Sequence, residues 1–152
     1  MKVHGQIVIK NSKENIWRAV TDIQSAAQVF KDIKSIEILE KPEQGFLGTR
    51  WKETREFMGK EATETMWITE VSDLQSYTSK AENSGCIYHS TIILEESENG
   101  VAVTKTFEST PVTWLAQLMA PLMVLMGGTL KKCLLKDLDD LKTHIEGHGS
   151  RK

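Results

Sequence analysis

The sequence predicts an α+β domain in which a curved antiparallel sheet of seven strands wraps around a long C-terminal helix. Three observations support this fold class. A strand pattern with two short helical patterns comes first, six strand-like runs follow without a break, and one long apolar helical pattern ends the chain. A sheet that curls around a helix leaves an internal space, and such spaces are where small molecules bind.

The first elements lie within residues 3–32. Residues 3–9 are rich in Val and Ile and predict the first strand. Ser12 is suited to cap a helix that begins at Lys13, because a serine hydroxyl can accept a hydrogen bond from a free backbone N–H of the first turn. A second short helical pattern covers residues 25–32. We therefore expect two short helices between the first and second strands.

Six further strands are predicted from runs rich in Thr, Val and Ile that alternate with turn residues. Several turns contain glycine, which supplies the positive φ that a tight hairpin turn needs. Consecutive hairpins of this kind give a meander of antiparallel strands. The predicted ranges are 33–40, 49–57, 61–71, 76–82, 86–95 and 101–109.

The C-terminal helical segment has two unlike halves. We expect it to start at Pro111, since proline suits a first helical turn, and to kink or break between about 119 and 128, where Pro121 and two glycines weaken it. Residues 112–126 are apolar on all sides, which predicts a buried position. The second half carries an apolar stripe that faces the sheet, made of Leu130, Leu134, Leu138, Leu141 and Ile145.

Length and charge limit the possible classes of protein. The 152 residues fit one domain, which we assign to residues 1–146, followed by a disordered tail over 147–152. A net charge of −2 offers no basic excess for phosphates, so we expect no nucleic-acid partner. No secretion signal is visible, which predicts a cytoplasmic protein. Polar and helix-breaking residues interrupt the apolar segment over 112–130 before it reaches the roughly 20 residues of a membrane span, so we expect none.

Several short motifs resemble the SRPBCC superfamily, whose helix-grip fold is shared by START domains, bacterial polyketide cyclase/dehydrase-like proteins and the birch pollen allergen. Residues 9–22 look like its opening segment, residues 48–53 like the strand after its glycine turn, residues 68–73 like a strand end, and residues 138–146 like its C-terminal ending. The resemblance implies a helix-grip fold and an apolar or amphipathic ligand such as a lipid, sterol, quinone or polyketide. In a minority of relatives it implies catalysis of cyclisation or dehydration.

The strand over residues 49–57 carries the most informative polar side chains. Strand alternation puts four residues on one face of this strand: Trp51, Glu53, Arg55 and Phe57. The resemblance at residues 48–53 implies that this face points toward the helix. A buried charge is costly unless it is paired, so Glu53 and Arg55 would bind each other or the polar end of a ligand. Glu53 could also act as an acid/base if burial raises its pKa. A structural ion pair near the cavity mouth is the third possibility.

The next strand has two possible registers. A two-residue turn at Gly59-Lys60 would turn Ala62, Glu64, Met66 and Ile68 inward, whereas a three-residue turn would turn Thr63, Thr65 and Trp67 inward. We favour the second register, because it lets Trp67 line the cavity beside Trp51.

Further candidates for the cavity wall lie on the later strands and on the helix. On the strands they are Tyr77, Tyr88, Ser90, Val103 and Phe107, with Lys105 either at the mouth or turned outward. On the helix they are Trp114, Leu118, Met119, Leu122 and Met126. This Met-rich helix fits an adaptable pocket wall, a loosely packed core, or a lid that touches membranes.

These features lead to three functional hypotheses. The first is a protein that binds or transports a hydrophobic or amphipathic small molecule between the sheet and the last helix. The second is a polyketide cyclase/dehydrase-type enzyme with Glu53 as acid/base and with Arg55 or a tyrosine hydroxyl stabilising an enolate. The third is a protein-interaction module of the kind found in chaperone-activator relatives, which would have a filled core and an exposed apolar patch. The four histidines are scattered, so we expect no metal site and no cofactor, and the oligomeric state stays open.

Overall fold

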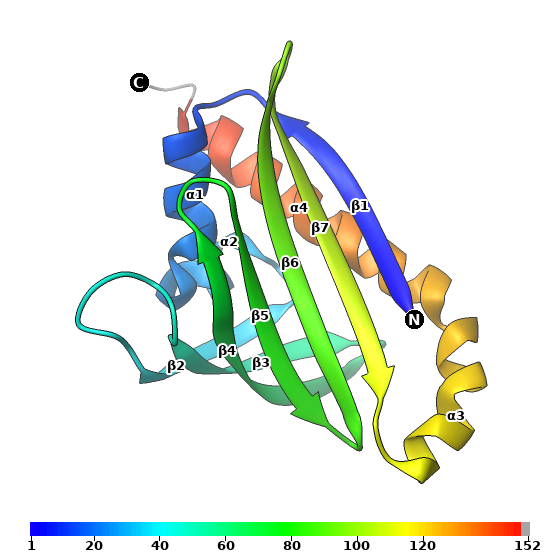
Figure 1. Ribbon diagram of the computed structural model, residues 1–152. Coiled ribbons are helices and arrows are strands. Elements are labelled where there is room, and N and C mark those ends of the chain that lie inside the picture. Colours follow the sequence, from blue (N-terminus) through cyan, green and yellow to red (C-terminus); the bar gives the residue numbers. More distant parts are fainter. Residues whose placement is uncertain (150–152) are drawn as a thin grey trace.

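The computed structural model describes residues 1–149 and shows a seven-stranded antiparallel sheet that curves around one long helix (Figure 1). The strand order is β1-β7-β6-β5-β4-β3-β2, so β2 to β7 form the expected meander and β1 pairs with β7. The strands are β1 (Lys2–Ile9), β2 (Ile33–Glu40), β3 (Arg50–Phe57), β4 (Lys60–Ser72), β5 (Ser76–Asn83), β6 (Cys86–Ser97) and β7 (Gly100–Pro111). The predicted fold class is confirmed, and all seven predicted strands are present.

Three short helical elements connect β1 to β2. Helix α1 (Lys13–Thr21) begins where the sequence predicts, and the side chain of Ser12 accepts a hydrogen bond from the backbone N–H of Asn15 at 3.1 Å. The 3-10 helix η1 (Ile23–Ser25) and helix α2 (Ala26–Val29) follow. These elements pack against β2, β6 and α4 and close one side of the space inside the sheet.

The C-terminal segment forms two helices, α3 (Trp114–Leu125) and α4 (Gly127–Gly149), with a bend of 68° between them. The predicted break is thereby confirmed. The predicted start is wrong, because Pro111 is the last residue of β7 and the hydroxyl of Thr113 caps α3 by accepting from the backbone N–H of Ala116 at 3.2 Å. The predicted tail begins at Gly147, whereas α4 continues to Gly149; the rest of that tail, residues 150–152, lies outside the described residues.

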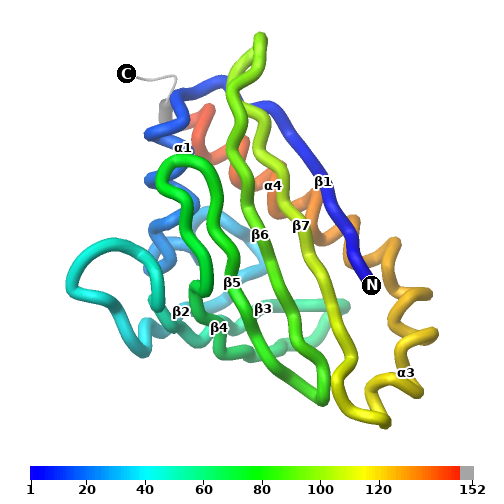
Figure 2. Tube along the Cα trace, in the orientation of Figure 1, coloured from blue at the N-terminus to red at the C-terminus, as the bar shows by residue number. Residues whose placement is uncertain are grey.

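Helix α4 is the element that the sheet grips, and its apolar stripe fills the core. Leu134, Leu138, Leu141 and Ile145 are buried, as the sequence predicts, whereas Leu130 is partly exposed and lines the space inside the sheet. Figure 2 shows α4 running along β1. A Cβ atom on Gly5 of β1 would lie 2.8 Å from Cδ2 of Leu134, so the helix approaches the backbone of β1 closely.

Helix α3 lies outside the grip of the sheet, contrary to the prediction that residues 112–126 are buried. Trp114, Leu118 and Leu125 are exposed, and Ala116 is the buried residue of this helix. The physical reason is that β7 ends at Pro111 and α4 already fills the apolar core. The bend therefore carries α3 beyond the end of the sheet, where Figure 1 shows it.

Among the described residues, no helix on its own combines the length and the apolar character that a bilayer crossing requires. Helices α3 and α4 meet this criterion only when taken together, with their 68° bend in between.

The turn from β6 to β7 gives a test of the fold. Gly100 has φ +141°, and a Cβ atom there would lie 2.4 Å from the backbone oxygen of Ile9. We expect Gly100→Ala to lower the free energy of unfolding by about 3 kcal/mol, because it adds a backbone clash to an unfavourable φ. The matched control is Gly59→Ala, where φ is +78° and no atom lies near the new Cβ, with an expected loss of about 1 kcal/mol. Equal losses in urea melts would contradict this account.

Candidate functional site

A cavity of about 420 Å³ lies between the concave face of the sheet and α4. Side chains from the α1–α2 segment and from strands β2 to β7 line it, with α4 and the end of α3 on the remaining side. Its wall is mostly apolar, with contributions from Ala19, Val20, Ile23, Ala26, Phe30, Ile33, Met66, Ile92, Leu130 and Leu134. The space is of the size and character that a small apolar ligand requires.

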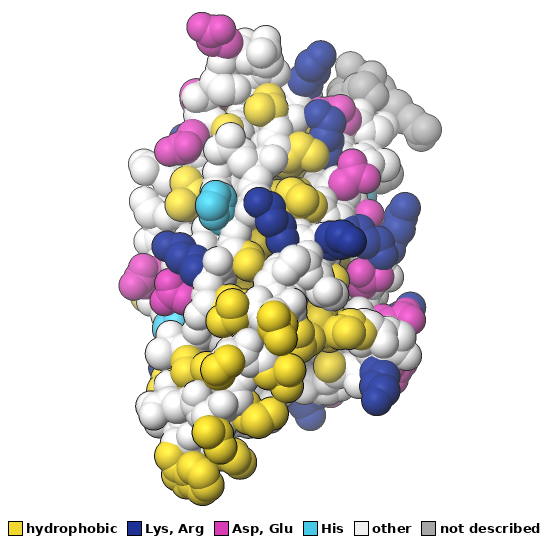
Figure 3. Space-filling view, turned by 90° about the vertical axis from the view of Figure 1, so that its right-hand side faces the viewer, with side chains coloured by type: hydrophobic (Ala, Val, Ile, Leu, Met, Phe, Trp, Pro, Cys, Tyr) yellow, Lys and Arg dark blue, Asp and Glu magenta, His cyan; other side chains and the backbone are white. Residues whose placement is uncertain are grey.

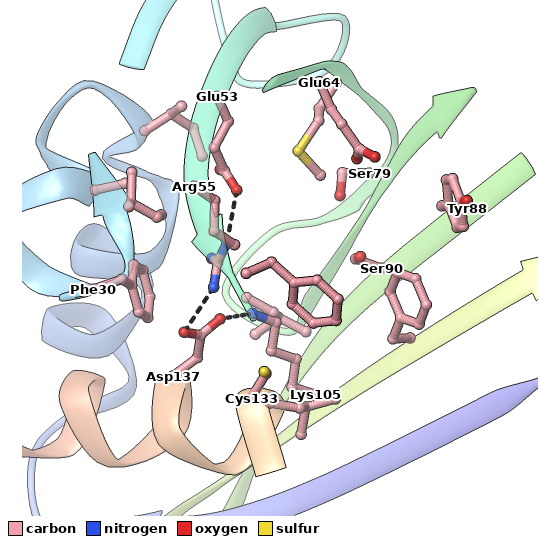
Figure 4. Close-up of a pocket in the computed structure, with 18 of the residues that line it drawn as sticks. Phe30, Glu53, Arg55, Glu64, Ser79, Tyr88, Ser90, Lys105, Cys133 and Asp137 are labelled. Carbon is pink, nitrogen blue, oxygen red and sulfur yellow. Dashed lines mark hydrogen bonds and ion pairs between the residues drawn. The ribbon is translucent and has the colours of Figure 1, made fainter. Parts of the chain in front are cut away.

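Four charged side chains meet inside this apolar space (Figure 4). The carboxylate of Asp137 accepts a hydrogen bond from Arg55 Nη1 at 3.0 Å and another from Lys105 Nζ at 2.9 Å. Arg55 Nε also donates to Glu53 at 3.3 Å. We call Glu53, Arg55, Lys105 and Asp137 the charged quartet. It contains two cations and two anions and is therefore neutral as a group.

Asp137 is the central member of the charged quartet. It lies on α4 among Leu134, Leu138 and Leu141, and only 3% of its surface is exposed. Desolvation on burial acts to raise the pKa of this carboxyl, but the charges and hydrogen bonds of Lys105 and Arg55 outweigh it and hold the pKa below its usual value. Asp137 is therefore ionised at neutral pH and connects α4 to β3 and β7.

Arg55 and Glu53 are each held by more than one contact. Desolvation acts to lower the pKa of Arg55, but the adjacent carboxylates of Asp137 and Glu53 raise it above its usual value. Glu53 also accepts a hydrogen bond from Trp51 Nε1 at 3.4 Å. Strand alternation explains the cluster, because Trp51, Glu53 and Arg55 are every second residue of β3 and all face inward.

Two tyrosines line the cavity in different ways. The hydroxyl of Tyr77 donates to the backbone oxygen of Val20 at 3.0 Å, and burial and the charge of Glu53 raise the Tyr77 pKa. Tyr88 stacks on Phe107, with ring centroids 5.6 Å apart. Burial and the neighbouring Cys86 raise its pKa to about 12. Both hydroxyls are therefore protonated at neutral pH.

The polar side chains extend beyond the charged quartet across the sheet. In Figure 4 Glu64, Ser79 and Tyr88 lie on the side of the cavity away from Phe30. Glu64 of β4 is the cross-strand partner of Glu53 of β3, so this group adjoins the quartet. A bound molecule can therefore meet both hydrogen-bonding groups and apolar side chains in this space.

Nine of the predicted site residues line the cavity. They are Trp51, Glu53, Arg55, Phe57, Tyr77, Tyr88, Ser90, Phe107 and Met126. Lys105, for which the sequence allowed two positions, faces inward and binds Asp137.

The remaining six predicted residues lie away from the cavity. Val103 faces the same side of the sheet but is fully buried in the core beside α4. Trp114, Leu118, Met119 and Leu122 are exposed on α3. The sixth is Trp67, whose position follows from the register of β4.

The favoured register of β4 is wrong. The loop between β3 and β4 contains two residues, Met58 and Gly59, both with positive φ as a type I′ turn requires. Phe57 therefore pairs with Lys60, and Glu64 and Met66 face the cavity. Trp67 instead lies on the convex side, where Arg50 stacks over its ring at 4.8 Å from the centroid.

Asp137 and Phe30 are the main site residues that the sequence analysis missed. Phe30 lies under Lys105, with Nζ 5.6 Å from its ring centroid. Asp137 resembles a solvent-facing residue, since its neighbours include Lys136 and Asp139. Its position three residues after Leu134, within the apolar stripe, was the signal that could have identified it.

Comparison with known proteins gives a family and several structures with the same fold. Residues 1–146 match the family described as polyketide cyclase / dehydrase and lipid transport. No curated protein is similar enough in sequence to match the chain.

Solved structures match over nearly the whole chain at low sequence identity. A protein from Thermus thermophilus is 16% identical, with 97% of this chain and 99% of that chain covered and a TM-score of 0.76. A START superfamily protein from Mycobacterium smegmatis is 15% identical, with coverages of 99% and 97% and a TM-score of 0.69. The di-domain ARO/CYC protein StfQ of the steffimycin biosynthetic pathway is 6% identical, with coverages of 98% and 51% and a TM-score of 0.77. These likenesses show the helix-grip fold.

Removing the charge of Asp137 tests the site. We expect Asp137→Asn to lower the free energy of unfolding at neutral pH by about 3 kcal/mol, because Arg55 and Lys105 lose their buried counter-charge. Since the folded-state pKa of Asp137 lies below its usual value, the unfolded chain takes up the proton first as the pH falls. The stability from Asp137 is thus present above about pH 4 and is lost at lower pH.

Urea melts from about pH 7 down to about pH 3 measure the free energy of unfolding of the wild type and of Asp137→Asn. The difference between the two free energies should shrink as the pH falls. The control is Asp139→Asn, an exposed neighbour on α4, with an expected change within about 0.5 kcal/mol. A difference that does not depend on pH would contradict the assigned role.

Proposed function

The chain belongs to the polyketide cyclase / dehydrase and lipid transport family, and we propose that it binds or carries a hydrophobic or amphipathic small molecule. The ligand class comprises lipids, quinones and polyketides, and the binding site is the cavity between the sheet and α4. We further propose that residues 1–146 perform this role as one domain in the cytoplasm.

The observation that carries this proposal is a mostly apolar cavity whose two lining cations, Arg55 and Lys105, are both paired with carboxylates. The two cations of the charged quartet are already bound to its two carboxylates. A ligand with a charged head group would have to displace one of these partners and leave a buried charge unpaired. A neutral oxygen, such as a carbonyl or hydroxyl group, can instead add a hydrogen bond without breaking an ion pair. We therefore expect a ligand with a neutral polar end and an apolar body.

The contacts of the carboxylates favour binding over catalysis. Glu53 accepts hydrogen bonds from Trp51 and Arg55, at 3.4 Å and 3.3 Å. The lowered pKa of Asp137 leaves it without a proton to donate at neutral pH. Both carboxylates thus serve as acceptors for the side chains that position them, and Asp137 cannot act as the general acid. The third hypothesis, an interaction module, requires a filled core and an exposed apolar patch. Helix α3 exposes such a patch, but the core holds a cavity of about 420 Å³.

A pair of fluorescent probes tests the proposal. N-phenyl-1-naphthylamine and 8-anilinonaphthalene-1-sulfonate share one ring system, but only the second carries a negative charge. We expect the neutral probe to bind at least about tenfold more tightly, because the sulfonate would disturb the charged quartet. Fluorescence titration of the purified protein measures both affinities.

Two variants on β6 locate the bound probe. Ser90 lines the cavity, and Thr91 points to the other face of the sheet. We expect Ser90→Phe to weaken binding of the neutral probe about tenfold by filling the cavity, and Thr91→Phe to change it by less than about twofold. Equal effects of the two variants, or no binding by the wild type, would contradict the proposal.

A further inference from the structure

Helix α3 exposes a continuous apolar surface. Six of its side chains are more than half exposed, and we call them the α3 surface: Trp114, Leu115, Leu118, Leu122, Val124 and Leu125. Figure 3 shows a hydrophobic patch without charged side chains at the lower end of the molecule, where α3 lies. An apolar patch of this extent on a small protein marks a surface for interaction with a partner.

The composition of the segment identifies the chemistry of that partner. Residues 109–130 contain no charged residue. The nearest acidic residues in the sequence are Glu108 and Asp137, and between them lie three lysines, Lys131, Lys132 and Lys136. Lys131 and Lys132 are exposed at the start of α4, directly after the α3 surface. An uncharged apolar tip followed by basic residues is complementary to a lipid bilayer with anionic head groups.

The distribution of apolar side chains around α3 favours lipid over a second protein surface. Leu115 and Val124 are nine residues apart, which places them on opposite sides of the helix, roughly 180° apart. They are nevertheless 56% and 62% exposed. A protein groove covers one stripe of a helix, as knobs-into-holes packing does. Lipid tails can surround the helix and so cover both sides.

We propose that α3 docks the protein on membranes, with its apolar side chains inserted into the outer part of the bilayer and Lys131 and Lys132 at the anionic head groups. Its 12 residues span roughly 18 Å, less than the roughly 30 Å of the hydrocarbon core, so α3 enters the surface and does not cross it. The α3 surface adjoins the cavity, because Met123 of the same helix lines it. The proposal concerns the outer surface and does not require the cavity to be filled.

Vesicle binding and tryptophan fluorescence test this proposal together. Trp17 and Trp51 are buried, whereas Trp114 is 77% exposed. With phosphatidylcholine vesicles that contain phosphatidylglycerol, we expect the protein to sediment and its emission to shift to shorter wavelength. Trp114→Phe should abolish the emission shift while sedimentation persists, because phenylalanine keeps the apolar contact.

Matched leucine variants locate the contact. Leu118→Glu should weaken sedimentation with vesicles about tenfold or more, because it places a charge within the inserted surface. The control is Leu47→Glu, an exposed leucine in the loop between β2 and β3, which should bind as the wild type does. The double variant Lys131→Gln and Lys132→Gln should lose about fivefold in affinity for each charge removed, and only with anionic vesicles.

Three results would overturn the proposal. The first is sedimentation of Leu118→Glu that equals that of the wild type. The second is an unchanged Trp114 emission in the presence of vesicles that the protein binds. The third is a dimer in analytical ultracentrifugation that Leu118→Glu dissociates, combined with no binding of the wild type to vesicles, because the occupant of the α3 surface would then be a second copy of this chain.

Discussion

The buried carboxylate of Asp137 holds α4 to two strands on different parts of the curved sheet. One oxygen binds Arg55 of β3, and the other binds Lys105 of β7. A lone carboxylate at this depth would lose its hydration without compensation, so the helix can occupy this position only with its cations in place. The two cations depend on Asp137 in turn, because they project into a mostly apolar cavity. The position of the helix and the polar end of the cavity are therefore one coupled arrangement.

The cavity itself follows from the uneven approach of α4 to the sheet. At β1 the missing side chain of Gly5 lets Leu134 and Leu135 come close to the strand, and the core is filled there. Toward β3 to β7 the helix instead faces open space, which the long side chains of Arg55 and Lys105 cross to reach Asp137. Close packing on one side and charged bridges on the other produce a stable domain that still holds an internal volume.

Features that depend on neighbouring residues were predicted well from the sequence. Features that depend on contacts between distant segments were predicted less well. Alternation along β3 put Glu53 and Arg55 on one face, and the family resemblance at residues 48–53 turned that face inward, where the structure has both residues. Trp67 was misplaced because one residue of turn length reverses the face of a whole strand. The predicted burial of α3 was wrong, because its apolar composition fits a core helix and an exposed apolar helix equally. Asp137 was missed because its partners lie 82 and 32 residues away in the chain.

Native mass spectrometry of the purified protein would show whether this fold encloses a small apolar or amphipathic molecule. The sample would be measured beside a portion that has been denatured and extracted with organic solvent. We expect an added mass in the native spectrum that disappears on denaturation and reappears in the extract as an uncharged lipid, quinone or polyketide. The mass of the bare chain in both spectra, with an empty extract, would contradict a carrier function.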